Sequence, residues 1–313
     1  MINEHIRDFM GKKIVEFESG ISIEKPESTA YRVSLTYEET EDGVLWADKF
    51  SSLLNIAGSD EIRALVIGPW ADVASGDTSD AVIETLVSAR ARLPKLTMIF
   101  FGDIIGEESE ISWIRQGDFA PLLAAYPALT HLVVRGGDNL SFGSLRHDHL
   151  QSLTIQTGGL GAQVVREIAN AQLPALEHLE LWLGTRNYGG NTTVEDLKPI
   201  LNGTKFPKLK YLGLRDSDIA DEVAKAVAQA PILNRIKILD LSLGTLTDQG
   251  AQALIESPGV AKLEFLDLHH HYCSEETVEK LNARALKVDT SDLRKAETYH
   301  GDNEIYRYVA VSE

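Results

Sequence analysis

The densest group of possible metal ligands in the sequence is the run His269-His270-His271-Tyr272-Cys273. Imidazole and thiolate groups bind zinc, but structural zinc sites use pairs of ligands that are spaced to form a tetrahedron. Side chains alternate between the two faces of a strand, so only His269 and His271 can share a face. The sequence has no second cysteine to complete such a site. The run therefore favours a polar strand end, and we predict no metal and no cofactor.

Catalytic chemistry finds little support in the same residues. A nucleophilic cysteine needs an activated thiolate beside an oriented base, and the neighbours of Cys273 on a strand point away from it. The carboxylates Glu180, Asp240 and Asp267 recur at one position of the repeat described below, and only the last two belong to adjacent repeats. We predict a protein that is not an enzyme. The alternative is a small-molecule- or metal-binding accessory protein, or an enzyme, that uses a His/Asp cluster near Asp267 and His269.

The composition narrows the range of partners. The 313 residues carry a formal net charge of −17, which repels phosphate backbones and argues against a nucleic-acid partner. A single cysteine permits no intramolecular disulfide and suits a reducing compartment. The first nine residues lack the apolar core of a signal peptide, and no stretch reaches the ~18 apolar residues of a membrane span. We therefore predict a cytoplasmic protein with no membrane partner.

A repeated apolar pattern must position any site in this chain. The pattern leucine-x-x-leucine-x-leucine has clear copies that start at Leu176, Leu209, Ile236 and Leu263. Weaker copies start at Ile62, Leu96, Leu129 and Leu150, and two more at the ends start at Ala30 and Ala283. Successive starts are separated by 20 residues (263 to 283) to 34 residues (62 to 96). One strand per unit of this length is typical of a leucine-rich-repeat solenoid.

Alanine-rich segments after the motifs indicate helices. The segments from Leu212 to Ala230 and from Leu239 to Leu254 resemble the ribonuclease-inhibitor class of leucine-rich repeats. This resemblance implies an α/β horseshoe with parallel strands on its concave face and helices on its convex face. The whole chain, including its end from Tyr306 to Glu313, resembles an uncharacterised family of cytoplasmic bacterial leucine-rich-repeat proteins. That family implies no particular activity.

The two ends of the chain do not follow the repeat. A solenoid must cover the apolar faces of its first and last repeats. We therefore predict an N-terminal cap at 1–29, the solenoid at 30–290 and a C-terminal cap segment at 291–313.

The outward positions 3, 5 and 7 of the motifs form three rows on the concave face. In the first repeats these rows carry Val66, Met98 and Phe100, an apolar patch that is either a binding surface or is covered by the N-terminal cap. Later repeats combine aromatic side chains with charges of both signs, which is the composition of binding hot spots. The predicted partner-binding residues are Arg135, His178, Glu180, Trp182, Tyr211, Arg215, Asp240, Asp267 and His269.

These residues predict a non-catalytic protein-interaction module that binds a protein or peptide partner on its concave face. We expect the loop from Gly184 to Thr193, with Arg186 and Tyr188, to overhang one edge of the site. The alternative is a solvated strand face with cross-strand charge pairs. For Trp182, the alternative is that it packs under its own loop as ordinary structure.

Overall fold

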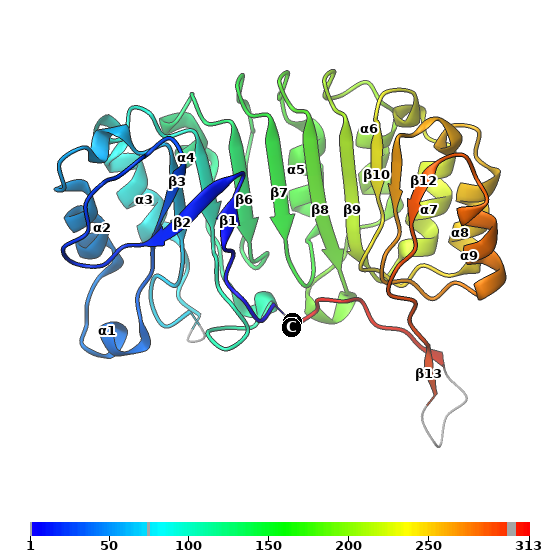
Figure 1. The fold of residues 1–313 in the computed structure, drawn as a ribbon, viewed down its shortest axis with the longest axis horizontal. Helices are drawn as coiled ribbons and strands as arrows, with labels where there is room; N and C mark the ends of the chain where they lie inside the picture. Colours follow the sequence, from blue (N-terminus) through cyan, green and yellow to red (C-terminus); the bar gives the residue numbers. More distant parts are fainter. Residues whose placement is uncertain (1, 74–75, 299–304) are drawn as a thin grey trace. The chain divides into compact units, whose positions relative to one another are not determined.

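The structure is a computed structural model, and it describes residues 2–73, 76–298 and 305–313. The chain divides into two compact units. Unit 1 comprises Met1–Gln156 with Ala171–Ala175 and Glu313, and unit 2 comprises Thr157–Asn170 with Leu176–Ser312. Figure 1 shows the elements of both units.

Unit 1 is a sheet whose neighbouring strands follow the order of the sequence. The first two strands are antiparallel and the others are parallel. The strands are β1 (Asp8–Phe9), β2 (Lys12–Glu16), β3 (Thr29–Val33), β4 (Ala64–Ile67), β5 (Met98–Phe101), β6 (His131–Arg135) and β7 (Ser152–Gln156). The helices of its described part are α1 (Tyr37–Glu41), α2 (Trp46–Leu54), α3 (Asp80–Ser88) and α4 (Ala120–Ala125).

Unit 2 repeats the same arrangement with parallel strands in sequence order. Its strands are β8 (His178–Gly184), β9 (Tyr211–Ser217), β10 (Ile238–Asp240), β11 (Phe265–Asp267) and β12 (Lys287–Asp289). Its helices are α5 (Ala162–Asn170), α6 (Val194–Leu201), α7 (Ala220–Ala228), α8 (Asp248–Glu256) and α9 (Glu275–Asn282). The short strands β13 (Glu297–Thr298) and β14 (Ile305–Tyr306) form a separate antiparallel pair.

The leucines of the motif build the core between strands and helices. Eight of them are between 0% and 2% exposed, as predicted: Leu179, Leu181, Leu212, Leu214, Leu239, Leu241, Leu266 and Leu268. Their alternation with outward residues fixes which face of each strand meets the helices. In Figure 1 the helices of each unit lie on one side of its strands. The predicted α/β leucine-rich-repeat solenoid is confirmed. We call the strand face opposite the helices, which carries positions 3, 5 and 7, the open face.

The register of the two terminal repeats differs from the prediction. Arg32 pairs with Val66, so the first motif starts at residue 28 and not at Ala30. Asp289 pairs with Asp267, so the last motif starts at residue 285 and not at Ala283. A shift by two residues leaves the inward and outward faces unchanged, and the apolar alternation alone therefore could not detect it. The correction places both Arg32 and Asp289 at position 5 of the open face.

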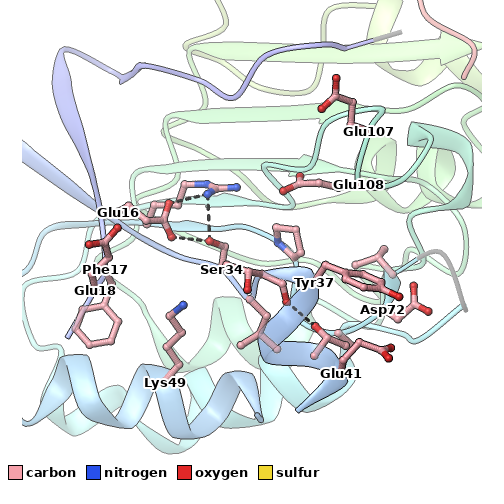
Figure 2. A pocket seen from close by; sticks show the side chains of 17 residues that line it. Glu16, Phe17, Glu18, Ser34, Tyr37, Glu41, Lys49, Asp72, Glu107 and Glu108 are labelled. Atoms are coloured by element: carbon pink, nitrogen blue, oxygen red, sulfur yellow. Dashed lines mark hydrogen bonds and ion pairs between the residues drawn. The ribbon is translucent and has the colours of Figure 1, made fainter. Parts of the chain in front are cut away.

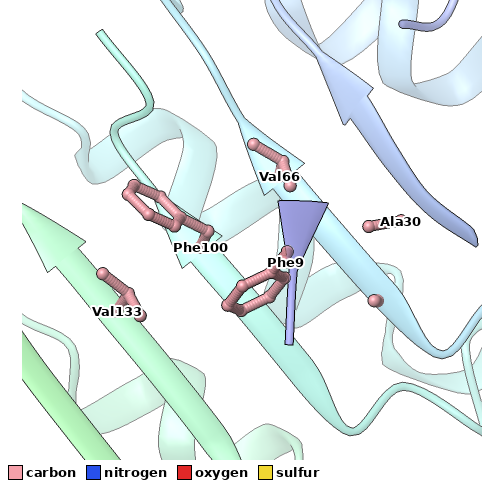
Figure 3. Close-up of a cluster of buried hydrophobic side chains, with 6 residues drawn as sticks. Phe9, Ala30, Val66, Phe100 and Val133 are labelled. Carbon is pink, nitrogen blue, oxygen red and sulfur yellow. The ribbon is translucent and has the colours of Figure 1, made fainter. Parts of the chain in front are cut away.

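The apolar patch on the open face of unit 1 is covered by the N-terminal segment. Figure 3 shows Phe9 beside Val66, Phe100 and Val133, and each of these four side chains is at most 5% exposed. The Phe9 and Phe100 rings meet edge to face with their centroids 5.8 Å apart. Ile6 also packs against this cluster. Of the two alternatives for the patch, the structure shows the covered one.

Candidate binding surface on the open face

Six of the nine predicted site residues come together on adjacent strands of unit 2. Parallel pairing places His178 beside Tyr211 and Trp182 beside Arg215. Glu180 and Asp240 flank Gly213, which is paired with both. We call these six residues, His178, Glu180, Trp182, Tyr211, Arg215 and Asp240, the central cluster. A Cβ atom at Gly213 would lie only 3.0 Å from the Tyr211 ring and 3.1 Å from Glu180 Cγ, so the glycine provides the space in which these side chains meet.

Arg215 is the cation at the middle of the central cluster. Its Nη1 donates to Glu180 Oε1 at 2.9 Å, and its Nε lies 3.2 Å from Asp240 Oδ2 and donates to Ser242 at 2.9 Å. The guanidinium carbon also lies 5.5 Å from the centroid of the Trp182 ring. One guanidinium therefore holds two carboxylates and an indole in fixed positions, as its planar fork of donors allows.

Glu180 is ionised within this arrangement. Burial by itself would raise the pKa of its carboxyl group, but hydrogen bonding from His178 and then the charge of Arg215 lower it to about 2. The His178 Nε2 and Glu180 Oε2 atoms are 3.4 Å apart. Trp182 adds a hydrogen bond by donating from Nε1 to Glu180 Oε1 at 2.7 Å. The carboxylate thus stays charged at any pH near neutrality.

Tyr211 joins the acidic and aromatic sides of the central cluster. Its hydroxyl donates to Asp240 Oδ2 at 2.6 Å. Burial, followed by the charges of Glu180 and Asp240, raises the pKa of Tyr211, so the phenol remains a donor. Its ring stacks on His178 with centroids 3.9 Å apart and an interplanar angle of 11°. The ring is therefore held face to face against the imidazole of the neighbouring strand.

Exposure divides the central cluster into supporting and accessible residues. Glu180, Trp182 and Asp240 are 8%, 7% and 4% exposed. His178, Tyr211 and Arg215 are half-buried. A partner can contact the second group, whereas the first group orients it. The Trp182 side chain is packed and hydrogen-bonded, as in the structural alternative for this residue.

A stripe of half-buried side chains extends from the central cluster. Position 3 of successive strands carries His178, Tyr211, Ile238 and Phe265, which are neighbours in register. We call these four residues the aromatic stripe. The stripe ends at Lys287, whose Nζ lies 5.2 Å from the centroid of the Phe265 ring. Ile238 and Phe265 are not among the predicted site residues, although their place in the same row is visible in the motif spacing.

Asp267 and His269 lie at the end of β11, one strand beyond the Asp240 strand. The Nδ1 atom of His269 is 2.7 Å from Asp267 Oδ1. The other two histidines of the run are buried: His270 contacts Asp292 at 3.1 Å, and His271 contacts the Thr290 carbonyl at 3.0 Å. They serve as polar structure at the strand end.

Cys273 is 3% exposed, and burial raises the pKa of its thiol to about 12. A thiol in that state is a poor nucleophile. This environment agrees with the expectation that Cys273 does not act in covalent catalysis.

Arg135 belongs to unit 1 and is 3% exposed. It lies 3.4 Å from Asp103 Oδ1, donates to the Ile104 carbonyl at 2.9 Å, and stacks over Phe100 at 5.1 Å. Arg32 binds the same Asp103 at 3.1 Å. A buried guanidinium of this kind is not accessible to a partner.

His5, from the N-terminal segment, completes this group of charges. Its ring nitrogens lie 3.4 Å from Asp103 and 3.4 Å from Glu108. The hydrogen bond to Asp103, followed by the one to Glu108, raises the pKa of His5 to about 9. We call His5, Arg32, Asp103 and Arg135 the buried ion network. The sequence pattern missed Arg32 in this network because the predicted rows left out the first repeat.

A pocket of about 500 Å³ lies beside the buried ion network (Figure 2). Its acidic lining consists of Glu16, Glu18, Glu41, Asp72, Glu107 and Glu108. Of its two cations, Arg32 is bound to Glu16 at 2.6 Å and Lys49 to Glu39 at 2.7 Å. Tyr37, which is 76% exposed, also lines it. The lining has the charge to receive a cationic group, but it is assembled from strands, helices and loops and leaves no spacing signal in the sequence.

The predicted overhanging loop contains the short 3-10 helix η5 (Arg186–Tyr188). The backbone N–H of Arg186 donates to Asp218 Oδ2 at 3.1 Å, and that of Thr185 donates to the Gly158 carbonyl at 2.8 Å. These bonds tie the loop to neighbouring turns of unit 2. Its role at the edge of a site stays a prediction.

Among the described residues, no helix is long and apolar enough to cross a membrane.

Comparison with known proteins found similar solved structures. No protein-family model and no curated protein matches the sequence. A protein of Bacteroides fragilis known from a crystal structure is 33% identical, over 84% of this chain and 74% of that one, with a TM-score of 0.79. This chain belongs to the same family as that protein. An internalin of Listeria monocytogenes covers 78% of this chain and 70% of its own at 16% identity, and its TM-score of 0.38 supports no conclusion.

Proposed function

We propose that this protein is a non-catalytic interaction module that binds a protein or peptide partner on the open face of unit 2. The observation that carries the proposal is the aromatic stripe, four half-buried side chains in register beside a row of carboxylates. Solenoids of this kind use their extended strand surfaces for binding. Aromatic side chains beside an arginine are typical of binding hot spots.

The chemistry of this surface indicates the partner. Position 5 beside the aromatic stripe carries Glu180, Asp240 and Asp267, and Arg215 is the guanidinium that compensates the first two. A partner segment with apolar side chains covers the stripe, and a lysine or arginine of that segment meets the half-buried Asp267 at the end of the acidic row. Electrostatic complementarity of this kind speeds association and selects the partner. The net charge of −17 favours basic partners in the same way.

We assign the contacts to His178, Tyr211 and Arg215, with Asp267 and His269 at the edge of the surface. Glu180, Trp182 and Asp240 hold the contact residues in place. The location that we propose is the cytoplasm, which the single cysteine supports. The alanine-rich helices α7 and α8, each directly after a strand of the repeat, support the ribonuclease-inhibitor class of repeats.

Peptide selection followed by variant binding tests the proposal. Peptides are selected from a random displayed library on the purified protein, and their affinities are measured by calorimetry. Arg215→Ala and His178→Ala are each expected to weaken binding by about 1–4 kcal/mol, the range of hot-spot residues. Arg166→Ala, on α5 with a side chain 58% exposed, is the matched control and is expected to bind like the unchanged protein. Equal affinity of all three variants would show that the site is elsewhere.

The Trp182→Ala variant tests whether Trp182 holds the contact residues in place or contacts the partner itself. Because Trp182 is 7% exposed and bonded to Glu180, the variant is expected to lose stability in thermal melts. The affinity of its folded fraction is expected to change less than that of Arg215→Ala. A variant that keeps its melting temperature and loses binding would instead make Trp182 a direct anchor.

A further inference from the structure

The row of carboxylates at position 5 continues beyond the central cluster. Asp240, Asp267 and Asp289 are successive partners in register on β10, β11 and β12. Arg215 compensates Asp240 at 3.2 Å. The Nδ1 atom of His269 lies 2.7 Å from Asp267 Oδ1. Two neighbouring carboxylates and one imidazole therefore face one another at the end of the row.

The donor atoms of these three side chains converge. One ligand atom each of Asp267, His269 and Asp289 lies within 4.8 Å of the other two, and all three residues are half-buried. Bonds from zinc to nitrogen or oxygen are about 2.0–2.2 Å long, so two ligands of one ion lie at most about 4.4 Å apart. Small rotations of the half-buried side chains are sufficient to close the difference.

The backbone already orients both carboxylates. Asp267 Oδ1 accepts the N–H of His269 at 3.0 Å, and Asp289 Oδ1 accepts the N–H of Ser291 at 2.9 Å. Hydrogen bonds to ligating carboxylates are a regular feature of metal sites, because they fix the ligand before the ion binds. The strands β11 and β12 supply this support from regular, paired backbone.

We propose that Asp267, His269 and Asp289 bind one divalent transition-metal ion, of the class of Zn²⁺ or Mn²⁺. Imidazole nitrogen suits zinc, and carboxylate oxygen suits manganese as well as zinc. Two carboxylates neutralise the charge of the ion. Three protein ligands in a half-buried site leave further coordination positions to water. His270 and His271 take no part, because they are buried and hydrogen-bonded elsewhere. The site shares Asp267 and His269 with the edge of the proposed peptide surface, but it rests on the convergence of three ligand atoms and not on peptide binding.

Calorimetric titration of Zn²⁺ and Mn²⁺ into untagged, chelator-treated protein tests this site. The expected result is one ion per chain, with Zn²⁺ bound more tightly than Mn²⁺. Asp289→Asn and His269→Ala are each expected to weaken binding by at least about tenfold, as loss of even a supporting group does. Asp292→Asn is the matched control, since Asp292 pairs with His270 at 3.1 Å on the adjacent turn and is expected to leave binding unchanged.

Three results would overturn the proposal. The first is no metal binding at about millimolar metal, and the second is that Asp289→Asn and His269→Ala bind the metal as tightly as the unchanged protein. The third is that Asp292→Asn loses metal affinity whereas Asp289→Asn keeps it. A second measurement needs no variant. In an NMR titration of the unchanged protein, Mn²⁺ is expected to broaden the imidazole resonances of His269 at a lower concentration than those of His5 or His149. Peptide affinity is also measured in the presence of a chelator, which removes the metal. This measurement tests the proposed function by itself, so that a failure of the metal site and a failure of peptide binding can be told apart.

Discussion

Asp103 in unit 1 and Asp216 in unit 2 occupy the same place in their repeats, position 8 of the motifs that start at Leu96 and Leu209. Both side chains are 0% exposed. Burial raises the pKa of each carboxyl group, yet the outcomes are opposite. The pKa of Asp103 is lowered, whereas that of Asp216 is raised to about 8.

The partners of the two aspartates explain this difference. Against the effect of burial, the hydrogen bond from His5 and the charges of Arg135 and Arg32 keep Asp103 ionised. Asp216 Oδ1 accepts the N–H of Val311 at 2.9 Å, but its Oδ2 atom has no hydrogen-bond partner among the described residues. Burial outweighs both this hydrogen bond and the charge of Arg215, and the carboxyl group is held in its neutral form. The same repeat position therefore gives an anion in one unit and a carboxylic acid in the other.

The largest expected effect follows from removing the anion of unit 1. Asp103→Asn leaves the buried guanidinium groups of Arg32 and Arg135 without their shared counter-charge. Breaking a buried ion pair from one side destabilises by about 3–5 kcal/mol. Urea unfolding at pH 7 measures the loss. A change below about 1 kcal/mol would contradict the view that this network holds unit 1 together.

Asp216→Asn is expected to stabilise the protein, in contrast to Asp103→Asn. Because the folded pKa of about 8 lies above the ordinary value of 3.8, the contribution of Asp216 to stability is fully present below pH 4 and is lost as the pH rises through 8. Asparagine keeps the acceptor for Val311 and tolerates the φ of 53° at this position. The variant is expected to be more stable than the unchanged protein by about 1–3 kcal/mol at pH 9, the penalty of a buried unsatisfied group.

Unfolding measured from pH 4 to 9 checks this prediction. The difference in free energy of unfolding between Asp216→Asn and the unchanged protein should increase with rising pH and level off above about pH 8. A constant gap would mean that Asp216 is ionised in the folded protein throughout this range.

His5→Gln is expected to have the smallest effect, because the His5 side chain is 33% exposed. The folded pKa of about 9 lies above the ordinary value of 6.5. The stabilisation from the charged imidazole is therefore fully present below pH 6.5 and is lost as the pH rises through 9. We expect His5→Gln to melt about 2–4 °C below the unchanged protein at pH 6. The two curves should converge by pH 10, and His149→Gln, at an exposed histidine of the same unit, should show no such convergence.

Much of the open face could be read from the sequence because the repeat is regular in the middle of the chain. The motifs at Leu176, Leu209 and Ile236 placed His178, Tyr211 and Ile238 in one row, and the strand register agrees with this placement. The terminal motifs are weaker and have one neighbouring repeat each, so their starts were misplaced by two residues. The predicted rows also left out the two terminal repeats, and Asp289 with them.

The exposure of the site residues could not be read in the same way. An outward position in a strand is compatible with the half-buried Tyr211 and with the buried Trp182 and Arg135. What decides between them is the set of side chains that meets each residue from neighbouring strands. Periodicity reports the direction of a side chain and says nothing about its neighbours.

The sequence by itself determined the solenoid, because the spacing of buried leucines specifies one strand per repeat and the face that meets the helices. The tertiary structure decided the chemistry at equivalent positions of those repeats. Asp103 is bonded to the backbone of Ile6, 97 residues away, and Asp216 to that of Val311, 95 residues away. Contacts over such distances depend on how the terminal segments fold back onto the repeats, and the cost of burying a charge depends on them.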